Sequence, residues 1–170
     1  RAPLFPATTL CRSRALHRHL REFPAADPLD GVRIPAAADI PHAIASRWPA
    51  ASSSLLQADA AALAALPLDH SVGVVAMRGG ADAAVRVVER FVAQRLDRYP
   101  EDRNEPEIEG TSGLSPYLHF GPVSTHQVFE AVARREGWTI DRLAAKASGK
   151  RSGWWGMSEA AEAFLDQLVT

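Results

Sequence analysis

Hydroxyl side chains and glycines crowd into one short stretch of the chain, GTSGLSPYLHFG, from Gly110 to Gly121. The hydroxyls of Thr and Ser are compact hydrogen-bond donors, and glycine lets a ligand approach the backbone closely. A proline in this stretch favours the start of a helix, whose free amides point toward an anion. The stretch therefore predicts a phosphate cradle. The alternative is that the hydroxyls cap their own helix, as they commonly do at helix starts.

Other reactive side chains are less well placed for chemistry. Neither Ser112 nor Ser115 has the Gly-x-Ser-x-Gly surroundings of a hydrolase nucleophile. The carboxylates of Glu159, Glu162 and Asp166 fall on an amphipathic helix, so we expect them to be solvated. One cysteine and six histidines without metal-ligand spacing predict no metal site.

Adjacent tryptophans, Trp154 and Trp155, stand beside Lys150 and Arg151 in a glycine-broken loop. Indole rings next to basic side chains can form a stacking platform for bases, with the cations on the phosphates. They can equally fix a loop onto a helical core, which is the interpretation that we favour. We likewise expect His119 to serve helix packing.

The order of residues in the cradle resembles the flavin-contacting motif of the DNA photolyase and cryptochrome family. The matching pattern is Thr-Ser-x-Leu-Ser-Pro-Tyr-Leu-x-Phe-Gly over residues 111–121, and it continues to Ser124. Upstream, Tyr99 stands where the family places a flavin-contacting tyrosine. Downstream, residues 164–168 are similar to the helix where the flavin pocket meets the lesion pocket.

The resemblance implies a fold that is mainly α and a division into two parts. Residues 1–77 would form an interdomain connector with short helices. Residues 78–170 would form the N-terminal portion of the helical FAD-binding domain. The family's working unit is several hundred residues long, whereas this chain has 170, begins without a methionine and ends inside an amphipathic pattern. We therefore expect a fragment.

The resemblance also implies a function, which is light-driven DNA repair. Reduced FAD, excited directly or through an antenna pigment in a missing N-terminal domain, would donate an electron to a pyrimidine dimer flipped out of the duplex. Arg103 would contact DNA, and Phe164 and Gln167 would line the substrate pocket, with Gln167 as the catalytic residue. The residues implied to bind FAD are Tyr99, Thr111, Ser112, Gly113, Leu114 and Ser115.

Two positions depart from the family pattern in the implied lesion pocket. Gln167 stands where many photolyases carry a glutamate, and Thr170 stands where many carry a tryptophan. A glutamine side chain still hydrogen-bonds to a pyrimidine edge but lacks the negative charge. Two alternatives to repair therefore stay open. They are a cryptochrome-like blue-light sensor that binds FAD, and an inactive truncated chain.

Hydrophobic periodicity places helices around the cradle. Val85, Val88, Val92 and Leu96 recur at helical spacing, which predicts a helix over residues 81–99 that Pro100 ends. The Ser-x-x-Gln pattern of residues 124–127 predicts a capping box for the next helix, and Ser158 can cap the last one. No stretch alternates cleanly enough to demand a strand.

The first half of the chain carries less chemistry. Residues 8–23 have helical spacing with a basic outer face, which we expect to be solvated, the alternative being contact with DNA or a partner. Prolines recur from Pro24 to Pro49 and favour a connector laid over another domain. Residues 50–66 are rich in Ala and Ser and predict one short helix.

Composition limits the remaining classes of function. Hydrophobic residues make up 46% and charged residues 23%, with no apolar run near the length of a membrane span. The single Cys11 excludes an internal disulfide framework and fits a reducing compartment. The net charge of −1 means that DNA binding would need a local basic patch. We expect a monomeric cytoplasmic protein without membrane or metal partners.

Overall fold

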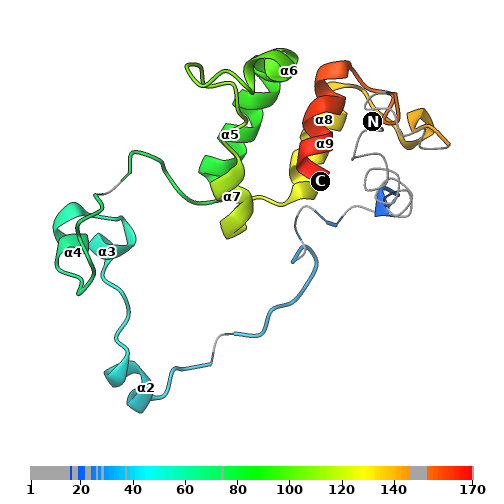
Figure 1. Ribbon diagram of the computed structural model, residues 1–170. Helices are drawn as coiled ribbons and strands as arrows, with labels where there is room; N and C mark the ends of the chain where they lie inside the picture. Colours follow the sequence, from blue (N-terminus) through cyan, green and yellow to red (C-terminus); the bar gives the residue numbers. More distant parts are fainter. Residues whose placement is uncertain are drawn as a thin grey trace, which may run out of the picture. The chain divides into compact units, whose positions relative to one another are not determined.

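The computed structural model describes residues 16, 19–21, 24, 25, 27, 29–36, 38–73, 75–145 and 153–169. Most of the predicted helix over residues 8–23 lies outside these residues, as do Lys150, Arg151 and Thr170. The chain separates into two compact units. Residues 29–77 form the small unit, and Arg1–Pro28 with Arg78–Thr170 form the helical unit. Figure 1 colours the chain along the sequence.

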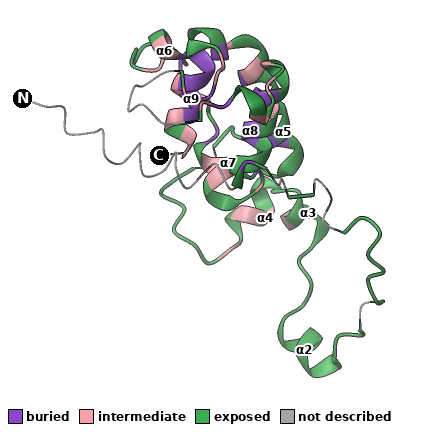
Figure 2. Cartoon of the chain, turned by 90° about the vertical axis from the view of Figure 1, so that its right-hand side faces the viewer, coloured by how far each residue is buried: buried purple, intermediate pink, exposed green. Residues whose placement is uncertain are grey.

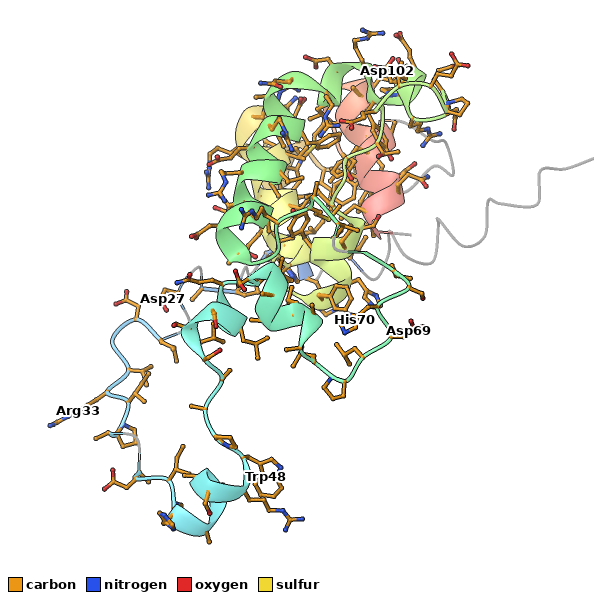
Figure 3. All side chains as sticks on the ribbon, turned by 90° about the vertical axis from the view of Figure 1, so that its left-hand side faces the viewer. Asp27, Arg33, Trp48, Asp69, His70 and Asp102 are labelled. Atoms are coloured by element: carbon orange, nitrogen blue, oxygen red, sulfur yellow. The ribbon has the colours of Figure 1, made fainter. Side chains whose placement is uncertain are left out.

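The described residues of the small unit form three short helices, with no buried residue within them. These are α2 (His42–Arg47), α3 (Ser53–Leu56) and α4 (Ala60–Ala64). The prediction of one helix over residues 50–66 is wrong, because Asp59 accepts hydrogen bonds from the amides of Ala61 and Ala62 and begins a second helix. Trp48, which follows α2, is 64% exposed, and its side chain projects from the ribbon in Figure 3.

From Arg78 onward, the first helix of the helical unit is α5 (Ala81–Gln94), which is followed by the 3-10 turn η1 (Leu96–Arg98) and by α6 (Tyr99–Asp102). The prediction of one helix through residue 99 is therefore wrong at its C-terminal end. The backbone leaves helical geometry at Arg95, where φ is −123°. Pro100 lies in the first turn of α6, where a missing amide costs nothing, so this proline starts a helix instead of ending one.

The buried face of α5 differs by one position from the predicted stripe. Val88 and Phe91 are buried as expected, and Leu96 is buried in the turn beyond. Val85, however, is 44% exposed, while Ala84 next to it is fully buried. The small Ala side chain lets the neighbouring helix approach closely, so the core side of α5 passes through Ala84.

The remaining elements of the helical unit are α7 (Ser115–Phe120), α8 (Thr125–Arg135), η2 (Ile140–Arg142) and α9 (Glu159–Val169). Both predicted caps are confirmed. The Ser124 hydroxyl accepts from the amide of Gln127, whose side chain accepts in turn from the amide of Ser124. The Ser158 hydroxyl accepts from the amide of Ala161 at 3.2 Å.

One core joins these helices. α8 packs against both α5 and α9, and α9 also packs against η1 and α6. Figure 2 shows the buried positions gathered in this helical unit. The largest fully buried side chains are those of Phe91, Leu96, Leu114, Val128, Val132, Glu162 and Leu165. The described residues contain helices and no strand, which confirms a fold that is mainly α.

Candidate flavin and DNA site

The cradle segment, residues 110–115, runs along α5 toward its N-terminal end. At its start, Gly110 is buried against α6, where a Cβ atom would overlap with the carbonyl oxygen of Asp102. At its end, Leu114 is 1% exposed and enters the core. Just beyond, the Tyr117 hydroxyl donates to the carbonyl of Arg78 at 2.6 Å, next to the start of α5. α6 and α7 accordingly lie at opposite ends of α5 (Figures 1 and 3).

The hydroxyls of the cradle do not cap the helix that follows. The N-cap residue of α7 is Leu114, and no side chain hydrogen-bonds to the amides of its first turn. Ser112 makes only a long 3.4 Å contact with the amide of Leu114. Thr111 and Ser115 are exposed, and their hydroxyls make no hydrogen bond to the described residues. The alternative of self-capping is therefore wrong, and these donors are available to a ligand.

Gly113 gives the cradle an open backbone position. Its φ of +70° lies in the left-handed region, which disfavours residues with a Cβ atom. The nearest atom to a Cβ at this position would be Cγ1 of Val87, at 3.8 Å, so the space beside it is not filled. A phosphate or ribityl group could approach the backbone here.

Tyr99 and Phe164 are brought together at the other end of α5. Their ring centroids are 5.3 Å apart, and each ring also contacts Phe91, at 5.7 Å from Tyr99 and 4.6 Å from Phe164. Tyr99 is 8% exposed and Phe164 is 3% exposed. Both rings therefore belong to the core of the helical unit, with Tyr99 slightly more exposed than Phe164.

Arg103 lies beside this aromatic cluster, whereas the side chain of Gln167 makes no hydrogen bond or ion pair with the described residues. The guanidinium carbon of Arg103 is 5.8 Å from the ring centroid of Tyr99, and its buried Nε has no hydrogen-bond partner among the described residues. Gln167 is exposed on α9. In the part of the chain that the structure describes, no hydrogen bond or ion pair joins Gln167 to Arg103 or to the cradle.

The prediction that Glu162 is solvated is wrong. Its carboxylate is 2% exposed instead of solvated, and it accepts hydrogen bonds from the amides of Gly153, Gly156 and Met157. Gly153 and Gly156 both have positive φ, at +89° and +67°. The sequence carried a signal for this arrangement, which is a glutamate in the first turn of a helix that follows two glycines. Glycines readily adopt positive φ, and such a backbone lets successive amides converge on one anion.

The two adjacent tryptophans fix the loop before α9 onto the core. Trp155 is 3% exposed, and its ring lies 5.3 Å from Phe129 and 4.6 Å from Trp154. The indole of Trp138 donates to the carbonyl of Trp155 at 2.6 Å. The packing interpretation is therefore confirmed for Trp155. His119, by contrast, is exposed and touches the ring of Phe120, so its predicted role in packing is wrong.

Within the described ranges, no three His, Cys, Asp or Glu side chains come together as a metal site would need. None of the helices in that part of the chain combines the length and the apolar character of a membrane span.

Known proteins give partial matches to this chain. The deoxyribodipyrimidine photo-lyase of Potorous tridactylus is 35% identical over 72 residues, which is 42% of this chain and 14% of the relative. That of Arabidopsis thaliana is 45% identical over 95 residues, which is 53% of this chain and 16% of the relative. That of Alkalihalophilus pseudofirmus is 32% identical over 75 residues, which is 44% of this chain and 15% of the relative.

The chain thus spans about a sixth or less of the length of these relatives. No protein-family model matches it, and no solved structure matches it at a significant level. The agreement among several curated proteins of the same name nonetheless confirms the resemblance found in the motif. The chain is photolyase-like.

Proposed function

We propose that this chain is part of a FAD-dependent, blue-light-driven DNA photolyase that repairs pyrimidine dimers. The observation that carries the proposal is the cradle, whose Thr111 and Ser115 hydroxyls are exposed and unpartnered within the described residues. Hydroxyls that capped α7 would already accept from its amides and would have less capacity left for a ligand. The similarity to curated deoxyribodipyrimidine photo-lyases supports the same function.

The cradle is suited to the phosphate and ribityl parts of FAD. Thr111, Ser112 and Ser115 supply neutral hydroxyl donors, and Gly113 supplies an unhindered backbone position. Leu114, buried in the core, holds the segment in place. Tyr99, which is 8% exposed, would also contact the flavin. When bound, FAD supplies the electron for repair, so the chain itself needs only to bind, orient and keep water away.

Arg103 and Gln167 are the residues that we assign to DNA. The Tyr99 ring lies beside the Arg103 guanidinium and limits the directions in which this cation can point toward a phosphate. The exposed amide of Gln167 can donate to a pyrimidine carbonyl and accept from a pyrimidine N–H. Phe164 would contribute indirectly, because its buried ring supports the turn of α9 that carries Gln167.

The small unit fits a connector between domains. Its three helices contain no buried residue, and Leu56, Leu68 and Val72 are each more than 60% exposed. Apolar side chains left uncovered in this way call for another surface to cover them. We assign residues 1–77 to the connector and residues 78–170 to the FAD-binding domain. A domain with an antenna pigment would supply the covering surface, and a reducing cytoplasm would suit the single cysteine.

The experiment compares two threonine variants of the full-length protein. Thr111→Val removes a cradle hydroxyl, whereas Thr125→Val removes an exposed hydroxyl on α8 that makes no hydrogen bond among the described residues. Flavin content after purification and FAD affinity by fluorescence titration are measured for both. We expect the FAD affinity of Thr111→Val to be about tenfold weaker than that of the wild type. The affinity of the control Thr125→Val should be unchanged. Equal flavin binding by both variants would contradict the cradle assignment. Flavin binding without light-dependent repair would favour the blue-light sensor.

A further inference from the structure

Arg95 reaches from the end of α5 to the loop that leads into the cradle. It is the first residue after α5, and one guanidinium nitrogen donates to the carbonyl of Glu109 at 3.1 Å. The two residues are 14 positions apart in the sequence. The Glu109 carbonyl directly precedes Gly110, so this bond fixes the backbone at the first residue of the cradle.

The bond to the backbone matters more than the ion pair beside it. The carboxylate of Glu109 lies 3.8 Å from the same guanidinium nitrogen, but its side chain is 99% exposed. An exposed pair at that distance contributes little, because solvent screens it. The carbonyl of Glu109 cannot move without moving Gly110, whereas its carboxylate can rotate freely.

No other side chain in the described ranges hydrogen-bonds to residues 104–110. The segment otherwise has its own turn bonds, such as Gly110 to Ile108 at 2.8 Å, a bond from the amide of Glu105 to the carbonyl of Asp102 at 3.0 Å, and the tight approach of Gly110 to Asp102. Because residues 105–109 are exposed, no core packing replaces the Arg95 bond. Downstream, the cradle is anchored by Leu114.

The burial of Arg95 supports a geometric role. Its side chain is only 23% exposed, and its Nε is buried without a hydrogen-bond partner. An unsatisfied buried donor destabilises a fold, so a lysine or an apolar residue would serve simple packing better. The planar guanidinium is suited to reaching a carbonyl at a fixed angle.

We propose that Arg95 is a positioning residue that holds the upstream end of the cradle for its ligand. The inference rests on the proposed function, in which the ligand is FAD. Arg95 does not touch the ligand. It acts through the Glu109 carbonyl. The backbone of residues 110–113 is then held at both ends, by that carbonyl and by the buried Leu114.

The test uses the full-length protein with Arg95→Met, Arg95→Lys and the control Arg90→Met. Arg90 is exposed on α5 and makes no hydrogen bond or ion pair among the described residues. The first measurement is hydrogen exchange, without FAD, of the backbone amides of Glu105, Ile108 and Gly110, which are hydrogen-bonded in turns. We expect about tenfold faster exchange in Arg95→Met, partial rescue in Arg95→Lys, and no change in Arg90→Met.

The second measurement is FAD affinity, compared with the midpoint of thermal unfolding. We expect Arg95→Met to bind FAD about tenfold more weakly, with Arg95→Lys between it and the wild type. Unchanged exchange and unchanged affinity in Arg95→Met would overturn the inference while the proposed function stands. A wild-type protein that does not bind FAD would contradict the proposed function instead, and the exchange comparison alone would then decide whether Arg95 holds the loop.

Discussion

The Glu162 carboxylate accepts a 3.0 Å hydrogen bond from the amide of Gly156, in the loop that leads into its own helix. The amides of Gly153 and Met157 bind the same carboxylate. Glu162 is 2% exposed, and among the described residues no cation pairs with it. Backbone amides alone therefore compensate this buried charge, and they tie the loop to α9.

Glu162→Gln should destabilise the protein by about 2–3 kcal/mol. Both carboxylate oxygens accept from amides, so the glutamine NH₂ group would face a backbone N–H with no acceptor. Denaturant unfolding followed by circular dichroism measures the change. The control is Glu159→Gln, an exposed glutamate in the first turn of the same helix, which should cost less than about 1 kcal/mol. Equal effects of the two variants would refute the role of the amide contacts.

Gly110→Ala should lower the free energy of unfolding by about 1–3 kcal/mol. The added Cβ atom would overlap with the carbonyl oxygen of Asp102, which is backbone and cannot rotate away. Gly79→Ala is the matched control, because no atom lies within 4 Å of a Cβ at Gly79. It should leave stability unchanged or raise it slightly. Comparable thermal midpoints for both variants would show that the loop tolerates the contact.

Phe164→Ala and Gln167→Ala should separate packing from function on α9. The Phe164 ring is 3% exposed and contacts Phe91 and Tyr99, so its removal should cost about 3–5 kcal/mol. Gln167 is exposed, and its truncation should change stability by less than about 0.5 kcal/mol. Urea unfolding monitored by tryptophan fluorescence measures both. A large stability loss in Gln167→Ala would mean that this side chain is structural.

The pKa of Asp69 in the small unit should lie below its ordinary value of 3.8. The cause is hydrogen bonding by Ser71, first from its amide and then from its hydroxyl, which favours the ionised carboxylate. The stabilisation is fully present above pH 3.8 and is lost as the pH falls through the lowered pKa. A carboxyl-detected NMR titration measures it. In Ser71→Ala the pKa should rise only partly, because the amide at 2.9 Å remains; a full return to 3.8 would be inconsistent with this order of causes.

Local sequence rules predicted much of the helical unit. The capping box of Ser124 and Gln127, the cap at Ser158 and the buried Val88 and Phe91 followed from spacing alone. These features depend on residues within one or two turns of each other. A sequence displays such relationships directly.

The features that escaped prediction depend on contacts across longer separations. The break after α5 places Arg95 within reach of Glu109, and the burial of Glu162 depends on a loop that curls back onto α9. Neither has a periodic signature. For the site, the motif predicted the cradle, but only the fold shows that Leu114 rather than a hydroxyl residue occupies the N-cap of α7. The assignments of Arg103 and Gln167 stay predictions.

Light-dependent repair by the full-length protein is the most direct measurement. A duplex with one cyclobutane pyrimidine dimer is incubated with the protein under blue light and in the dark, and the flavin content of the same sample is determined. Bound FAD with dimer reversal only in the light is the result that we predict. A flavin-free protein, or one that binds flavin yet leaves the dimer intact in the light, would contradict the assignment of this photolyase-like chain to DNA repair.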